Sequence, residues 1–288
     1  MTKAGALKSK LRAGVIALCA VAAGMVGCGS GEPDVAAGPP TLSGKLVITG
    51  SSTVAPLATE IGKRFESLHP SVRVDVQTGG SSRGIADARS GLADIGMASR
   101  ALKDSEADLF THTIARDGVA MIVHATNPVA ELSDEQIVAI YRGEIENWKD
   151  VGGKDAEIVV VNKAAGRATL EVFVEHFRLE PGEIRAAVVV GDNQHGINTV
   201  SGNENAIGYV SIGTADYEVR EGRPLRLLPV GGVPATIESV ASGAFPMSRP
   251  LNLVTRAAPE GLAREFIEFA QSDRVHDLIE AQYFVPAR

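Results

Sequence analysis

Residues 45–102 read KLVITGSSTVAPLATEIGKRFESLHPSVRVDVQTGGSSRGIADARSGLADIGMASRAL, and the order of patterns in this stretch decides the fold. The β-rich run at 45–49 predicts a strand, and the turn at 50–53 ends it. Beyond the turn, apolar residues recur at helical spacing, which predicts a helix with one buried face. These apolar positions are Leu57, Ile61, Phe65 and Leu68.

The same order then occurs a second time. Residues 72–76 alternate between apolar and polar side chains, as in a half-buried strand, and the Gly- and Ser-rich segment 79–84 follows them. A helix is predicted at 85–92 and a short strand at 94–98. Alternation of strand, turn and helix favours an α/β fold, in which helices cover the faces of a sheet with parallel strands.

The rest of the chain continues with both kinds of element. A helix is predicted to begin at the N-cap Ser133, with Glu135 and Gln136 in its first turn, and another is predicted at 169–177. Two amphipathic helices are expected to close the chain. Further strands are predicted at 119–124, 158–161, 187–190, 206–210 and 251–255.

The first residues have the pattern of an export signal. Four basic residues by position 12 precede an apolar stretch at 13–26, which is shorter than the roughly 20 residues that span a bilayer. The following Cys28 resembles the lipidated cysteine of a bacterial lipobox, although Met25 stands where Leu is usual. Residues 1–27 are therefore predicted to be a lipoprotein signal peptide, with a lipid on Cys28. An ordinary signal peptide with an incidental cysteine is the alternative.

Composition limits the mature chain. Residues 28–44 are rich in Pro and Gly without an apolar period, which predicts a flexible tether before a folded domain at 45–288. Without the signal, 24 Lys and Arg stand against 35 Asp and Glu, a formal charge of −11. No basic run interrupts this charge, which argues against nucleic acid as a partner. Any anion must therefore bind through short-range hydrogen bonds.

Three Ser- and Thr-rich turns are candidates for such a site. The turns at 50–53, 80–84 and 166–169 each follow a predicted strand and open a predicted helix. The first N–H groups of a helix lack partners within it and favour negative charge, so each turn could hold an anion. Each Ser or Thr could instead be an ordinary N-cap. Three such turns at strand ends favour a ligand site, because α/β proteins bind ligands there.

A fourth candidate element follows the strand at 94–98. It brings Ser99 and Arg100 to the carboxyl end of that strand, where a guanidinium could bind an oxyanion with two hydrogen bonds. Taken alone, an arginine after a strand is more often a surface residue.

Together these segments resemble the extracytoplasmic phosphate-binding proteins of high-affinity phosphate ABC transporters. The matching pieces, in order, are ITGSSTVAPL, GGSSRGIADARSGLADIGMASRAL, IYRGEIENW, NKAAGRATLEVF, NAIGYVSIG and FPMSRPLNLVT. The resemblance implies a two-lobed periplasmic binding protein-like fold of type II, with mixed sheets flanked by helices and the ligand between the lobes. The first lobe would comprise about 45–126 and 250–288, and the second about 127–249.

The resemblance also implies ligand residues. The hydroxyl of Thr53 and the N–H of Val54 would bind phosphate, and Ser81 and Ser82 would add donors. The full set of expected phosphate-binding residues is Ser52, Thr53, Val54, Ser81, Ser82, Ser99, Arg100, Gly166, Arg167, Ala168 and Thr169.

Two departures from the family pattern concern selectivity. Family members carry an Asp, which accepts the phosphate proton, where this chain has Ser99, and an Arg where it has Lys163. Arg100 and Arg167 could restore the positive charge. A different acceptor for the phosphate proton would then be required, because an unpaired buried polar group costs about 1–3 kcal/mol.

The expected function is phosphate capture and delivery to an ABC permease by a monomeric, lipid-anchored protein on the extracytoplasmic side of a bacterial membrane. No catalysis, cofactor or metal is expected. Two alternatives remain. Gly80–Gly84 matches the G-x-S-x-G pattern of serine hydrolases, with Ser82 as nucleophile and a later histidine such as His276 as base. The same fold could instead serve a sensor or an adhesion module that binds another oxyanion.

Overall fold

A computed structural model of the protein describes residues 42–287, within a compact unit at Thr41–Arg288. The predicted signal peptide, Cys28 and most of the predicted tether lie outside the described residues. Residues 42–44 of that tether belong to the folded unit, because Leu42 packs against its core and Gly44 pairs with Val72. No helix in the described part of the chain is long and apolar enough to span a membrane.

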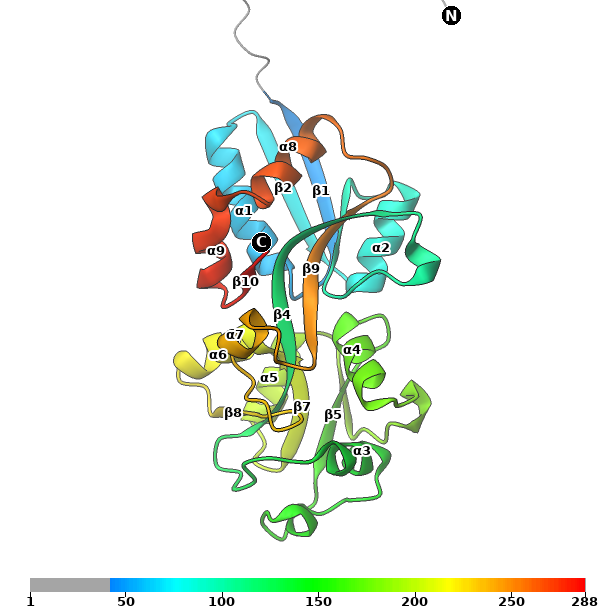
Figure 1. The fold of residues 1–288 in the computed structure, drawn as a ribbon, viewed down its shortest axis with the longest axis vertical. Helices are drawn as coiled ribbons and strands as arrows, with labels where there is room; N and C mark the ends of the chain where they lie inside the picture. Colours follow the sequence, from blue (N-terminus) through cyan, green and yellow to red (C-terminus); the bar gives the residue numbers. More distant parts are fainter. Residues whose placement is uncertain (1–41, 288) are drawn as a thin grey trace, which may run out of the picture. The chain divides into compact units, whose positions relative to one another are not determined.

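The first lobe is built from the stretch that opens the sequence analysis. Strand β1 (Gly44–Gly50) pairs in parallel with β2 (Val72–Thr78) and β3 (Ile95–Ala98). Helix α1 (Ala55–Leu68) joins β1 to β2, and α2 (Ser81–Ser90) joins β2 to β3 (Figure 1). The predicted α/β alternation is confirmed.

Two long antiparallel strands connect this lobe to the second one. Strand β4 (Phe110–His124) pairs with β9 (Ser248–Thr255) as far as Gly118. From Val119 onward it pairs with β7 (Ala206–Ser211) and β8 (Leu225–Leu228). Figure 1 shows β4 and β9 side by side where they pass between the lobes. The change of partner comes earlier in the chain than the lobe boundary expected near 127. The sheet is therefore mixed rather than parallel throughout.

The second lobe continues the sheet on the other side of β4. Its strands are β5 (Val159–Lys163), β6 (Val188–Val190), β7 (Ala206–Ser211) and β8 (Leu225–Leu228). Its helices are α3 (Asp134–Arg142), α4 (Ala168–Phe177), α5 (Asn193–Ser201), α6 (Ile212–Arg220) and α7 (Ile237–Ala241). Helices α8 (Gly261–Ala270) and α9 (His276–Ala281) and strand β10 (Val285–Pro286) return to the first lobe, where α8 and α9 contact α1.

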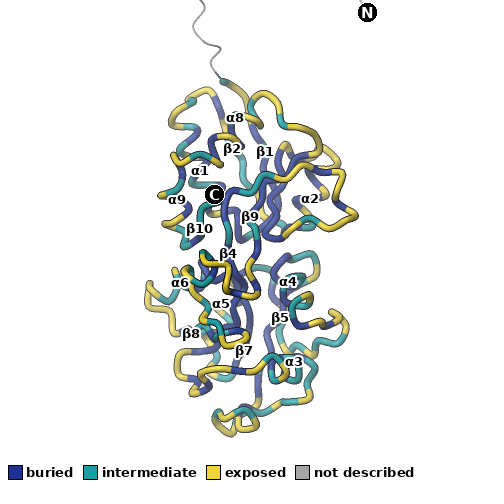
Figure 2. Tube along the Cα trace, viewed as in Figure 1, coloured by how far each residue is buried: buried dark blue, intermediate teal, exposed yellow. Residues whose placement is uncertain are grey.

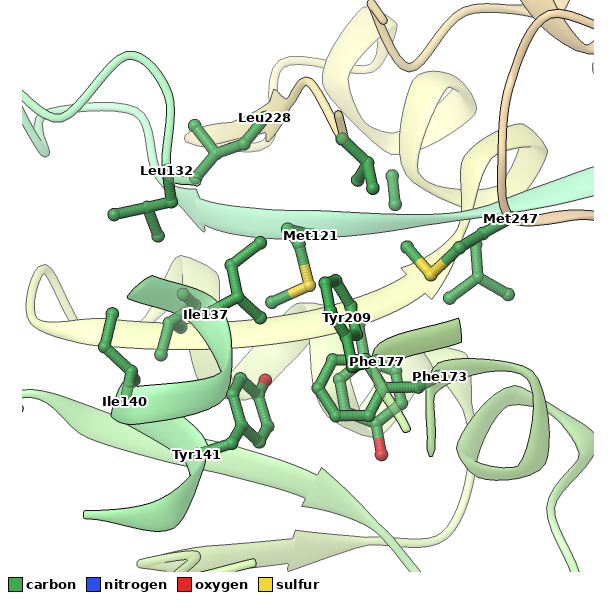
Figure 3. Packing of buried hydrophobic residues seen from close by; sticks show 14 of the residues in the cluster. Met121, Leu132, Ile137, Ile140, Tyr141, Phe173, Phe177, Tyr209, Leu228 and Met247 are labelled. Atoms are coloured by element: carbon green, nitrogen blue, oxygen red, sulfur yellow. The ribbon is translucent and has the colours of Figure 1, made fainter. Parts of the chain in front are cut away.

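Each lobe has its own hydrophobic core, and buried chain also runs through the connecting strands (Figure 2). In the second lobe, the rings of Phe173 and Tyr209 stack with centroids 4.1 Å apart, and Tyr141 packs beside them (Figure 3). Trp148, 1 % exposed, donates its indole N–H to the carbonyl of Asn205. These aromatic contacts anchor α4 and β7, so the loops at the ends of both elements are held in fixed positions.

A close approach of backbones fixes where α2 begins. A Cβ atom at Gly84 would lie 2.6 Å from the Thr49 carbonyl oxygen and 2.7 Å from Gly50 Cα. Only glycine allows the first turn of α2 to contact the end of β1 this closely. The helix start at Ser81 is thereby held beside the turn that follows β1.

The substitution Gly84→Ala should destabilise the protein, although alanine favours a helix by up to about 1 kcal/mol over glycine. The new methyl group meets backbone atoms that cannot move aside, and overpacking of this kind costs about 1–3 kcal/mol. Urea denaturation followed by circular dichroism measures the change. Gly182→Ala is the matched control, because nothing lies within 4 Å of its added Cβ. Equal stability of the two variants would contradict this account of the packing.

Candidate functional site

The structure brings together the starts of α1, α2 and α4, which follow β1, β2 and β5 respectively. No side chain caps α2 or α4, whereas Ser133, Asp192, Ser211 and Thr236 cap other helices. At α1, the hydroxyl of Ser51 accepts from the N–H groups of Thr53 and Val54, at 3.2 and 3.4 Å. The hydroxyls of Ser81 and Thr169 therefore do not act as N-caps, and the first N–H groups of α4 have no partner within the helix.

Three of the predicted hydroxyls surround one guanidinium group that sequence reasoning did not select. Arg249, in β9, donates to Thr169 Oγ1 at 3.1 Å, to Thr53 Oγ1 at 3.3 Å and to Ser99 Oγ at 3.4 Å. Its side chain is 1 % exposed. Thr53 and Ser99 belong to the first lobe and Thr169 to the second, so a single cation on a connecting strand joins hydroxyls of both lobes.

Asp117 is the counter-ion of this arginine. The two residues lie directly opposite each other on β4 and β9, and Arg249 Nη2 and Nε donate to Asp117 Oδ2 at 2.8 and 3.1 Å. The other carboxylate oxygen accepts from the Gly213 N–H at 3.3 Å. The Asp117 side chain is fully buried, so the pair is removed from water and held by hydrogen bonds on all sides.

A chain of hydrogen bonds orients the surrounding hydroxyls. Ser51 Oγ donates to Ser99 Oγ at 3.0 Å, and the Ser99 N–H donates to Ser81 Oγ at 3.1 Å. Asn193, at the start of α5, donates to Thr53 Oγ1 at 3.1 Å. Because the Thr53 oxygen accepts from both Asn193 and Arg249, its own proton is left to be donated. The same holds for Thr169, whose oxygen accepts from Arg249.

Lys163 adds a second buried cation at the carboxyl end of β5. It is 3 % exposed, and its Nζ donates to the carbonyl of Asp192 at 2.5 Å. Burial, with a smaller contribution from the positive charges of Arg249 and Arg167, lowers the pKa of Lys163 to about 7 against the opposing effect of Asp192. An anion placed near this amine would favour its charged form.

Arg100 does not join this cluster. Its terminal nitrogens donate to both oxygens of Glu106, at 2.7 and 2.8 Å, and its Nε lies 3.0 Å from Glu171 Oε2. A guanidinium held by two carboxylates is not free to grip an oxyanion in the way the sequence suggested. The positive charge at the hydroxyl cluster comes from Arg249 instead.

The remaining predicted residues lie at the junction of the two lobes. The Ser82 N–H donates to the Gly166 carbonyl at 3.3 Å, and Ser82 Oγ donates to Glu171 Oε1 at 3.2 Å. A Cβ atom on Gly80 would lie 3.1 Å from the side chain of Arg167, which passes over that glycine. Ala168 is buried and Ser52 is half-buried.

Nothing in this geometry supports the serine hydrolase alternative. Among the described residues, Ser82 hydrogen-bonds to a glutamate and to no histidine, and His276 pairs with Asp273 at 3.5 Å. The residues that the structure describes also contain no group of three or more His, Cys, Asp or Glu side chains placed to hold a metal ion.

Comparison with known proteins agrees with this architecture. Residues 35–274 match the model of the PBP superfamily domain. The chain is 27 % identical over 258 residues to the phosphate-binding protein PstS of Bacillus subtilis, covering 88 % of this chain and 84 % of that protein.

Two solved structures also match over most of the chain. One from Clostridium perfringens, described as a phosphate ABC transporter substrate-binding protein with bound phosphate, is 35 % identical with a TM-score of 0.78. The match covers 85 % of this chain and all of that one. An ABC-type phosphate transport receptor from Vibrio cholerae is 33 % identical with a TM-score of 0.71, over 84 % of this chain and 100 % of that one.

The substitution Asp117→Asn should unfold the protein at much lower denaturant concentration. It leaves Arg249 buried without a counter-ion, and breaking a buried pair in this way costs about 3–5 kcal/mol. Equilibrium urea denaturation measures the loss. Asp108→Asn is the matched control, because Asp108 also makes a two-point contact with an arginine, Arg89, but both side chains are largely exposed. Similar losses in both variants would show that burial is not the cause.

In buffer free of oxyanions, the free energy of unfolding should contain a contribution from Lys163 that depends on pH. The folded-state pKa is about 7, below the ordinary value of 10.5, so between these values the unfolded chain binds a proton that the folded chain does not. Stability then rises with pH in this window, by up to about 1.4 kcal/mol per pH unit, and the gain is lost as pH falls towards 7. Urea denaturation at pH 7, 8 and 9 should show this slope, and Lys163→Met should lack it. Parallel curves for the two proteins would refute the assignment.

Proposed function

This chain belongs to the PBP superfamily, and we propose that it is an extracytoplasmic solute-binding lipoprotein that captures inorganic phosphate between its lobes and delivers it to an ABC permease. The observation that carries the proposal is the buried Arg249–Asp117 pair, which is surrounded by hydroxyls of both lobes. Relatives named for phosphate binding, and a structurally similar protein with bound phosphate, support the choice of ligand.

The proposed site binds its anion with donors rather than with net charge. The hydroxyls of Thr53 and Thr169 are oriented to donate, and the first N–H groups of α4 add the partial positive charge of a helix start. Hydrogen bonds to a charged group are stronger than those between neutral groups, and more so where water is excluded. This suits a protein whose mature chain is strongly acidic, because short-range donors act where long-range attraction is missing.

Binding without chemical change is part of the proposal. The residues that would touch the anion are hydroxyl donors and a guanidinium already paired with Asp117, and this set offers no activated nucleophile with a general base. The protein would release the same anion that it captured. The wider proposal of a lipid on Cys28, a monomer and lobes that close on the ligand extends the expectations from the sequence.

Selectivity follows from the same hydrogen bonds. Ser99 Oγ accepts from Ser51 and from Arg249, which leaves this hydroxyl no lone pair for the proton of phosphate, and both oxygens of Asp117 already accept hydrogen bonds. We propose that the cluster recognises the charge and the tetrahedral shape of the anion rather than its proton. The dianion should then be the preferred form.

Isothermal titration calorimetry on the full chain should give one phosphate per molecule, and phosphate should raise the melting temperature. Thr53→Val and Thr169→Val keep the shape of each side chain and remove one donor to the anion. Each should lower the affinity by about 1.5–3 kcal/mol, which is tenfold to somewhat over a hundredfold.

Thr111→Val is the control, because Thr111 is an exposed β4 residue away from the cluster, and it should bind as the wild type does. Sulfate, molybdate and phosphate should be titrated in parallel. If phosphate gives neither heat nor a thermal shift while another oxyanion gives both, the ligand is misassigned. Unchanged phosphate affinity in both threonine variants would show that the hydroxyl cluster does not bind phosphate.

A further inference from the structure

One glutamate of the second lobe has its side-chain partners in the first lobe. Glu171, in the first turn of α4, accepts from Ser82 Oγ at 3.2 Å through Oε1. Its other oxygen, Oε2, forms ion pairs with Lys103 Nζ at 2.5 Å and with Arg100 Nε at 3.0 Å. Among the described residues, Glu171 is the one side chain of the second lobe in these contacts, so the contacts exist only while the lobes are together.

The first-lobe half of this contact is assembled on its own. Glu106 accepts hydrogen bonds from both terminal nitrogens of Arg100 and from the Lys103 N–H, the last at 2.9 Å. These hydrogen bonds hold the pKa of Glu106 below its ordinary value, and those from Arg100 have the largest effect. Arg100 is 6 % exposed at its side chain and also donates to the Ala101 carbonyl. The arginine therefore keeps its orientation and its counter-ion whether or not Glu171 is present.

Glu171 differs from its partners in what it loses when the lobes separate. Its side chain is 19 % exposed in this structure, next to a cleft of about 910 Å³ that Arg100, Lys103 and Arg249 also line. On opening, its carboxylate would exchange three protein partners for water, while the Arg100–Glu106 pair would stay intact. The contact thus has a different free energy in the two states, which is the requirement for biasing an equilibrium between them.

We propose that Glu171 is an interlobe clasp that holds the closed state and slows release of the bound anion. This rests on the proposed function, since it assumes that the lobes close on an anion. The clasp is separate from the hydroxyl cluster around Arg249, and it acts by raising the fraction of closed molecules rather than by touching the ligand.

The direction of the change in anion affinity on removal of the Glu171 charge distinguishes this proposal from a purely electrostatic effect. Glu171 is negative, so removing its charge would strengthen anion binding if the residue acted only through its field. A clasp predicts the opposite result, because its loss favours the open state. The sign of the change in affinity therefore separates the two explanations.

The test compares Glu171→Gln with Glu175→Gln in the full chain. Glu175 lies one helical turn further along α4, is exposed and borders the same cleft, so its substitution makes the same change of charge without breaking an interlobe contact. Stopped-flow release of phosphate should be about fivefold faster in Glu171→Gln and unchanged or slower in Glu175→Gln. Glu171→Asp, which keeps the charge and shortens the reach, should also release faster than wild type. Thermal unfolding checks that all variants are folded.

Small-angle X-ray scattering without ligand provides a readout that does not depend on phosphate. Glu171→Gln should have a larger radius of gyration than wild type and Glu175→Gln should not. Wild-type release and wild-type scattering in Glu171→Gln, or tighter phosphate binding in that variant, would overturn the clasp. If no variant binds phosphate but Glu171→Gln is still more expanded, the clasp stands and the proposed ligand is wrong.

Discussion

The buried pair of Arg249 and Asp117 is the interaction on which the site depends. A guanidinium and a carboxylate without access to water are stable only when each is fully hydrogen-bonded, and here the partners come from β4, β9, α6 and the hydroxyls of both lobes. The cross-strand register that places the two residues opposite each other also places the arginine between the turns after β1 and β5. Fold and site therefore share one constraint, the pairing of β4 with β9.

Around this pair, hydrogen-bond donors come from uncharged groups, and the buried arginines are paired with carboxylates. Helix starts and hydroxyls provide hydrogen-bond donors without adding net charge to an acidic protein. The two buried arginines of the described residues are each paired with a carboxylate, Arg249 with Asp117 and Arg100 with Glu106, so neither is left with an uncompensated charge. Lys163 differs, because its amine donates to a backbone carbonyl oxygen, and burial lowers its pKa.

Much of the fold was predictable from the sequence, because strand and helix periods alternate clearly from β1 to β3 and the capping box at Ser133 marks α3. The three turns were also found, since each combines small residues, hydroxyls and a following helix. Arg249 and Asp117 were missed because neither is unusual within its own segment. They become a site only through pairing of strands more than a hundred residues apart. The partners of Arg100 were missed as well: Glu106 lies only six residues away, but nothing in the sequence shows that these side chains pair, and Glu171 lies in a distant part of the chain.

The double connection by β4 and β9 has a mechanical consequence. Both strands run through the junction, so a rotation of one lobe against the other would pivot about them, and displacement would grow with distance from that pivot. Arg249 lies on β9, one of these two connecting strands. The cation beside the anion would thus move little on rotation of the lobes, while the helices at the outer ends of the lobes would be displaced much further. A small displacement near the ligand would therefore correspond to a larger displacement at the outer ends of the lobes.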